Sequence, residues 1–187
     1  MAKRVSLFKV LRRDLGARLE AEGFVEVPQD KSSQSYKLMY FRDASHGSPL
    51  GFWFQRDVKA LWVDLLGSSF TIEFFRSLED PYEMSERERC FHLFTEPELE
   101  EMRELQNRMI RRLPPVESIM KPWEVQIFGK SVERDRQLVT EPFNRWHEEW
   151  MRYRDEEDLL AWIPFLARIL PSLVERFDAA KPEPKRE

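Results

Sequence analysis

The amino-acid sequence predicts an α+β protein, with an N-terminal helix packed on an antiparallel β-meander and further helices towards the C-terminus. One observation is a helical repeat of leucines at positions 7, 11, 15 and 19. A second is segment 50–75, where short runs of aromatic and β-branched residues are separated by turn-forming residues. The third is that strong helical periodicity returns only after residue 95, whereas a parallel sheet requires helices that alternate with strands.

The first predicted helix runs from Ser6, a residue type suited to the N-cap, to about Glu22. Gly23 follows where a residue in the left-handed conformation commonly ends a helix. Acidic residues are interleaved with basic ones along this segment, which argues against a targeting or membrane-surface helix. We therefore expect the helix to lie on the sheet.

The predicted sheet begins with two strands, over residues 24–27 and 36–42, on either side of a polar loop. Segment 50–75 supplies three more strands, over residues 50–56, 60–66 and 70–75. The charged segment 76–89 is expected to form a loop or a frayed helix, and residues 90–94 an edge strand. Together these segments form a meander.

The C-terminal half is expected to be mainly helical. Thr95 and Glu98 have the spacing of a capping box, which predicts a helix that runs to about Leu113. Alternation of apolar and polar residues over 123–127 predicts a short strand. The next helix is expected from Thr140 to about Arg154.

The last predicted helical segment begins at Asp155, a good N-cap residue. Pro164 and Pro171 fall inside it, and each removes a backbone donor, so we expect kinks or breaks there. The sequence thus predicts a single domain over residues 1–178, with helix and sheet in 1–95 and mainly helices in 96–178. Residues 179–187 are expected to form a flexible tail.

Composition narrows the class of protein. The 187 residues are 42% hydrophobic and 34% charged, with a net charge of -4, which is typical of a globular protein. This acidic balance argues against nucleic-acid binding. The single Cys90 excludes an intrachain disulfide and fits a reducing compartment. No apolar run has the length of a membrane span or a signal peptide, so we expect a cytoplasmic protein without a membrane contact.

Motifs for catalysis, metals and cofactors are missing from the sequence. His46, His92 and His147 have no metal-ligand spacing, and the few glycines form no phosphate-binding loop. Cys90 and His92 have the residue types of a nucleophilic pair, but a free cysteine is more often a small buried apolar residue. We therefore predict no catalytic residue, no metal site and no cofactor.

The two faces of the predicted sheet differ in chemistry. One face is expected to pack against the helical core through Phe52, Phe54, Leu61, Val63, Leu65, Phe70, Ile72 and Phe74. The opposite face mixes tryptophan with acidic side chains. Its candidate binding residues are Trp53, Gln55, Asp57, Trp62, Asp64 and Glu73.

Two explanations of this second face stay open. Tryptophans can anchor a protein partner, and the acidic residues can meet its cationic groups. Alternatively, a C-terminal helix covers the face, either the helix that carries Trp146 and Trp150 or the last one.

These observations favour a non-catalytic cytoplasmic protein-interaction domain, such as an immunity-type or regulatory binding protein. The alternative is an enzyme or small-ligand binder with a pocket between the sheet and the C-terminal helices. Its candidate proton-transfer groups are Asp64, Glu73, His92 and His147. Nucleic-acid binding comes third, since it depends only on Arg108, Arg111 and Arg112, whose place at a helix end the helix dipole explains.

Two sequence features carry a resemblance to a known family. The sequence Gln55-Arg56-Asp57 is followed by the pattern GxxFTIEF over residues 67–74, and Gly23-Phe24 ends the first helix. In these features and in the order of its elements, the first half of the chain resembles a family of small bacterial α+β proteins of unknown function. The resemblance implies the helix-plus-meander fold and no particular activity.

Overall fold

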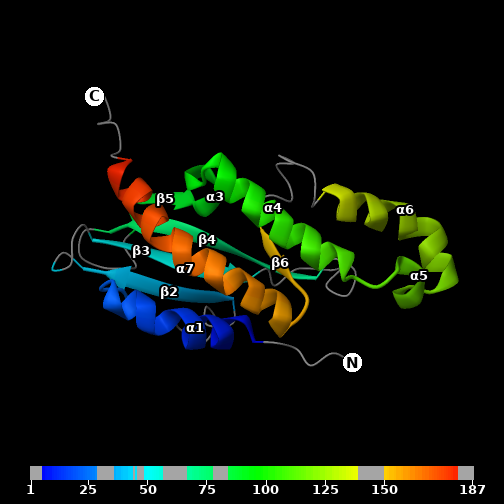
Figure 1. Ribbon diagram of the computed structural model, residues 1–187, viewed down its shortest axis with the longest axis horizontal. Coiled ribbons are helices and arrows are strands. Elements are labelled where there is room, and N and C mark those ends of the chain that lie inside the picture. The colour runs from blue at the N-terminus through cyan, green and yellow to red at the C-terminus, as the bar shows by residue number, and fades with distance from the viewer. Residues whose placement is uncertain are drawn as a thin grey trace.

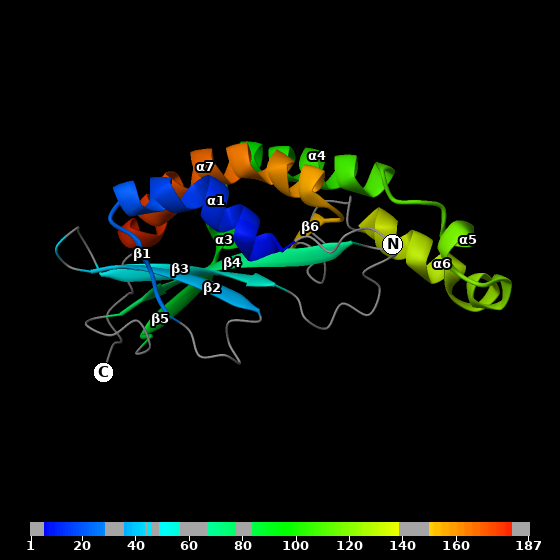
Figure 2. The same ribbon diagram turned by 90° about the horizontal axis from the view of Figure 1, so that it is seen from below.

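The computed structural model describes residues 6–28, 36–43, 45, 49–56, 67–77, 84–138 and 150–180. It has an α+β fold, in which an antiparallel sheet of six strands carries helices on one face (Figures 1 and 2). The elements follow one another as α1 (Leu7–Ala21), β1 (Val25–Glu26), β2 (Lys37–Arg42), β3 (Leu50–Arg56), β4 (Ser68–Arg76), β5 (Glu86–Arg89), α3 (Cys90–Leu93), α4 (Glu96–Arg111), α5 (Val116–Ile119), α6 (Pro122–Leu138), β6 (Met151–Tyr153) and α7 (Glu156–Ala179).

The sheet is a meander of five strands to which one strand from near the C-terminus is added. Strands β1 to β5 lie side by side in chain order, and β6 pairs with the beginning of β4 on the same edge as β5. The outer edge of β6 is closed by a side chain of α4, since the backbone N–H of Arg152 donates to Oε1 of Gln106 over 2.9 Å. The Gln106 amide also donates to the carbonyl of Trp150 over 3.1 Å. Gln106 therefore takes the place of a further strand.

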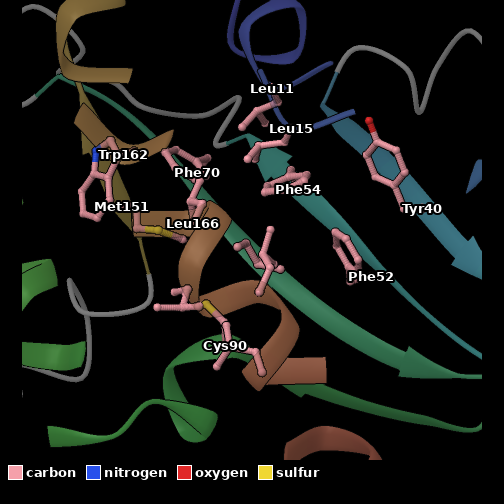
Figure 3. Packing of buried hydrophobic residues seen from close by; sticks show 14 of the residues in the cluster. Leu11, Leu15, Tyr40, Phe52, Phe54, Phe70, Cys90, Met151, Trp162 and Leu166 are labelled. Carbon is pink, nitrogen blue, oxygen red and sulfur yellow. The ribbon is translucent and has the colours of Figure 1, made fainter. Parts of the chain in front are cut away.

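The main core lies between this sheet and helices α1 and α7. Register places Phe52 opposite Phe74 and Phe54 opposite Ile72, so these side chains share one face of the sheet. They belong to one core cluster with Leu11 and Leu15 of α1 and with Trp162 and Leu166 of α7. Figure 3 shows Leu11 and Leu15 next to Phe54, and Trp162 next to Phe70. The predicted core face is confirmed for its described members, Phe52, Phe54, Phe70, Ile72 and Phe74.

Ion pairs hold α4 along α7. At one end the carboxylate of Glu98 accepts two hydrogen bonds from Arg176, at 2.6 and 2.7 Å. At the other end Arg112 of the α4 C-cap pairs with Asp155, over 3.1 Å, and with Asp158. Asp158 is buried, so its charge requires this partner. The two pairs fix how the long helices lie over the core.

Several predicted boundaries are confirmed. Gly23 follows α1 with a positive φ of 84°, and Thr95 and Glu98 form the capping box that begins α4. Asp155 caps α7 and accepts a 3.1 Å hydrogen bond from the backbone of Asp158.

Two predicted strands are wrong, because both are helical. Residues 90–93 form the short helix α3, in which the buried Cys90 joins the core. Residues 123–127 lie in helix α6, whose first residue is Pro122, a residue that favours the first turn of a helix. Alternation over so few residues does not distinguish a strand from one side of a helix.

Three further predictions need correction near the C-terminus and in the charged segment. Residues 86–89 form strand β5 rather than a loop or helix. The helix expected to reach Arg154 is not helical at its end, where residues 151–153 form strand β6. Helix α7 runs through Pro164 and Pro171 without a break, since the apolar residues of its inner side are held in the core.

Some predictions lie outside the described residues. They are the strand over 60–66 with Leu61, Val63 and Leu65, the part of the predicted helix over 140–149, and residues 181–187 of the tail. Strand β3 pairs directly with β4, whatever the conformation of the segment between them. None of the helices in the described ranges combines the length and the apolar composition that a bilayer span needs.

Candidate functional site

The face of the sheet predicted to bind a partner is the one that none of the described helices covers. Trp53, Gln55 and Glu73 lie together there, because Trp53 is opposite Glu73 and next but one to Gln55. The helices α1, α4 and α7 all lie on the other side (Figure 2). The last helix therefore does not cover the face, whereas residues 140–149 of the other helix that could cover it lie outside the described residues.

Trp53 is nevertheless fully buried, with 0% of its surface exposed. It stacks on Phe75 with 5.2 Å between ring centroids and contacts Met39, and these three form a second, smaller core cluster. Val27, Phe41 and Met84 pack around it. In this structure Trp53 belongs to a core and is not an exposed anchor.

Charged side chains surround this second cluster. The Nζ of Lys37 lies 3.9 Å from the centroid of the Trp53 ring, a cation–π contact. Burial lowers the pKa of Lys37, Glu73 opposes that effect, and Arg87 adds to it. Glu73 also lies 3.9 Å from Arg87, so the acidic group already faces cations of the same chain.

The indole Nε1 of Trp53 on this face is buried and has no hydrogen-bond partner among the residues that the structure describes. The other candidates of this face, Asp57, Trp62 and Asp64, lie outside the described residues. The structure thus brings together three of the six predicted site residues, around a buried ring.

The groups predicted for the alternative, a catalytic pocket, are dispersed where they are described. Glu73 lies on the face without helices, whereas His92 is exposed on α3 and contacts Glu88. Cys90 is fully buried, and burial raises the pKa of its thiol to about 12, so it stays protonated. His147 and Asp64 lie outside the described residues. Within the described ranges, no group of acidic, histidine and cysteine side chains has the arrangement of a metal site.

The arginines at the end of α4 are partly used within the protein. Arg112 makes ion pairs with Asp155, Glu157 and Asp158 at the start of α7. Only Arg108 and Arg111 stay exposed, on a protein of net charge -4. The arginine cluster on which nucleic-acid binding depended is thus reduced to two exposed side chains next to an acidic helix end.

A surface that the sequence did not predict is formed by α5 and α6, which we call the arm. Pro114 and Pro115 separate the arm from α4, and the arm lies at one end of the long axis of the molecule (Figure 1). It has its own small cluster, formed by Val116 and Val132 with Met120 and Val125. Glu124 caps α6 by accepting a 2.7 Å hydrogen bond from the backbone of Lys121.

The other side of α6 is exposed. Trp123 is 55% exposed and Ile127 63% exposed. Phe128 of α6 and Ile119 of α5 are exposed as well. Trp123 and Ile127 continue at helical spacing to Lys130 and Arg134, and we call these four residues the arm stripe. Neither Lys130 nor Arg134 makes an ion pair with a described residue.

The signal for the arm stripe was present in the sequence. Its residues recur every three or four positions after a proline, which is a helical pattern. The alternation over 123–127 obscured it, and no sequence pattern shows that the helix turns its apolar side chains to solvent.

Comparisons with known proteins add no relative. No family model matches the chain, and neither the curated proteins nor the solved structures contain a significant match. The resemblance to small bacterial α+β proteins therefore stays a prediction. Function has to be argued from the surfaces themselves.

Proposed function

We propose that this protein is a non-catalytic protein-interaction domain that binds its partner through the arm stripe. The observation that carries the proposal is the exposure of Trp123 and Ile127 on one side of α6. Tryptophan is among the residues most enriched at the energetic centres of protein interfaces. An immunity-type or regulatory binding protein of the bacterial cytoplasm is the class we favour.

The arm is suited to this role by its position. The sheet with α1, α3, α4 and α7, which we call the body, is held together by the main core cluster. The arm has a separate small cluster. A partner can therefore cover the arm stripe without changing the packing of the body. Exposed aromatic and aliphatic side chains that are grouped on one surface commonly mark such contacts.

The face around Trp53 supports binding less well. Its ring is buried, and the described charges around it already face one another. We therefore propose that Trp53 stabilises the fold. Lys37, Gln55 and Glu73 lie around the second cluster and do not form a binding site. The enzyme alternative has no described group of side chains in its favour.

Quantitative affinity capture from a lysate of the source cells tests the proposal. The wild-type chain serves as bait beside the double variant Trp123→Ala, Ile127→Ala. The matched control is Leu160→Ala, an apolar helical residue that is 45% exposed on the body. We expect a protein that wild type and control retain equally and that the double variant loses. With bait held well above micromolar concentration, equal recovery on all three baits, or no specific protein and no second copy of the chain on any of them, would refute the proposal.

A further inference from the structure

From the composition of the arm stripe we infer that its partner is a second copy of this chain, bound through an antiparallel pair of α6 helices. The inference rests on the proposed function, because it names the partner of the same surface.

The arm stripe changes in character along the helix. Its first half is apolar, with Trp123 and Ile127, and its second half is cationic, with Lys130 and Arg134. A surface that binds its own copy about a two-fold axis must be complementary to itself in reverse order. In an antiparallel pair, the apolar half of one arm stripe faces the cationic half of the other. This pairing is favourable, because a cation is attracted to the face of an indole.

The geometry of an antiparallel pair can be stated residue by residue. When the two-fold axis passes Ile127, this side chain meets its own copy at the centre. In each copy, Trp123 lies four residues before Ile127, and Lys130 and Arg134 lie three and seven residues after it. Because the two helices run in opposite directions, Trp123 of one copy lies next to Lys130 and Arg134 of the other. The same contacts occur twice, once on each side of the axis.

The charges support this occupant over an acidic lipid surface. Lys130 and Arg134 have no ion-pair partner among the described residues, so both are available to the indole of a second copy. Residues 116–138 carry as many acidic as basic side chains, which gives the arm no net attraction to anionic lipid. One short helix pair buries less than a standard interface of ~1,600 Å², so we expect a weak dimer with a dissociation constant in the micromolar range.

Sedimentation velocity of the purified full chain over a wide range of concentration tests the inference. We expect wild type and Leu160→Ala to show the same concentration-dependent dimer. Trp123→Ala is expected to dissociate at least about tenfold more readily, with an unchanged circular-dichroism spectrum. A wild-type chain that stays monomeric at millimolar concentration would overturn the inference, and so would a Trp123→Ala dimer as stable as wild type.

Cysteine crosslinking tests the antiparallel arrangement. With an added oxidant to take up the electrons of the thiol pair, Ile127→Cys should form an intermolecular disulfide rapidly, because the two copies meet at the axis. Glu133→Cys is the matched control, since it is exposed on the same helix but lies far from the axis. The native Cys90 is buried and does not compete. Equal rates for the two variants would exclude this pairing.

The inference and the proposed function can fail separately. A monomeric chain that still captures another protein through Trp123 would overturn the second copy as partner and leave the interaction role standing. Vesicles of anionic lipid, added in a flotation assay, provide the third possibility. Binding to them that depends on Trp123 would contradict both proposals.

Discussion

Two tryptophans, Trp53 and Trp123, show how the body and the arm of this protein differ. Trp53 lies in the middle of the sheet with 0% exposure, stacked on Phe75 and with the Nζ of Lys37 over its ring. Trp123 lies on α6 with 55% exposure, on the side of the helix away from its own small cluster. The same side chain is therefore part of a core in one region and part of a surface in the other.

The difference teaches that residue type alone does not identify a binding site. The sequence placed two tryptophans and several acidic residues on one sheet face, and this composition resembled an interface. Burial of Trp53 indicates that the described part of this face stabilises the fold. The arm, in which only residues 123–127 were predicted as a short strand, has the exposed side chains that a partner can reach.

The largest effect is expected for Trp53→Ala. The substitution removes a fully buried indole and its stacking on Phe75, so we expect a loss of about 4 kcal/mol in the free energy of unfolding. Urea denaturation followed by circular dichroism measures this loss. A variant as stable as wild type would show that the ring lies in a site and not in a core.

The next largest effect concerns the ion pair that holds α4 to α7. Burial alone would raise the pKa of Glu98, but hydrogen bonds from Arg176 and Thr95 lower it from 4.5 to about 2. Because the pKa of Glu98 is lower in the folded than in the unfolded chain, the ionised carboxylate stabilises the fold at pH values above about 4.5. This contribution is lost as the pH falls from about 4.5 towards about 2.

We therefore expect Glu98→Gln to cost about 2 kcal/mol at neutral pH and to lose less stability than wild type as the pH falls through that window. Urea titrations at several pH values provide the measurement. Because the pair belongs to the body, binding through the arm should be unchanged at neutral pH. Parallel pH profiles for variant and wild type would contradict the assignment.

A smaller effect is expected at Gly51, which allows Phe75 to lie close against the sheet. A Cβ at this position would come within 2.3 Å of the Phe75 ring and 2.6 Å of the backbone oxygen of Tyr40. Gly51→Ala should therefore destabilise the protein by about 1.5 kcal/mol, by displacing Phe75 from Trp53. The comparison with Gly16→Ala is informative, because the nearest atom outside the helix to a Cβ there, the Tyr40 hydroxyl, is 4.0 Å away. Equal stability of the two variants would mean that Phe75 can move freely.

Much of the fold could be predicted from the sequence. The leucine repeat of α1, the capping box at Thr95 and the cap at Asp155 are local signals, and the structure confirms each of them. The core face of β3 and β4 follows from simple alternation. Such features depend on residues close together in the chain.

The errors arose where long-range contacts decide the structure. Strand β6 forms because β4 and Gln106 supply partners that are distant in the chain. Pro164 and Pro171 stay inside α7 because the core holds that helix on its apolar side. The candidate site failed for the same reason, since alternation predicts which face Trp53 occupies but not whether that face is covered.

The free energy of unfolding of Trp123→Ala tests the contrast between the two regions most directly. If Trp123 serves a partner and not the fold, urea denaturation at low protein concentration should give a value within about 0.5 kcal/mol of wild type. The loss expected for Trp53→Ala would then be at least about eightfold larger. A loss for Trp123→Ala as large as that for Trp53→Ala would show that the arm tryptophan is structural, and would contradict this account.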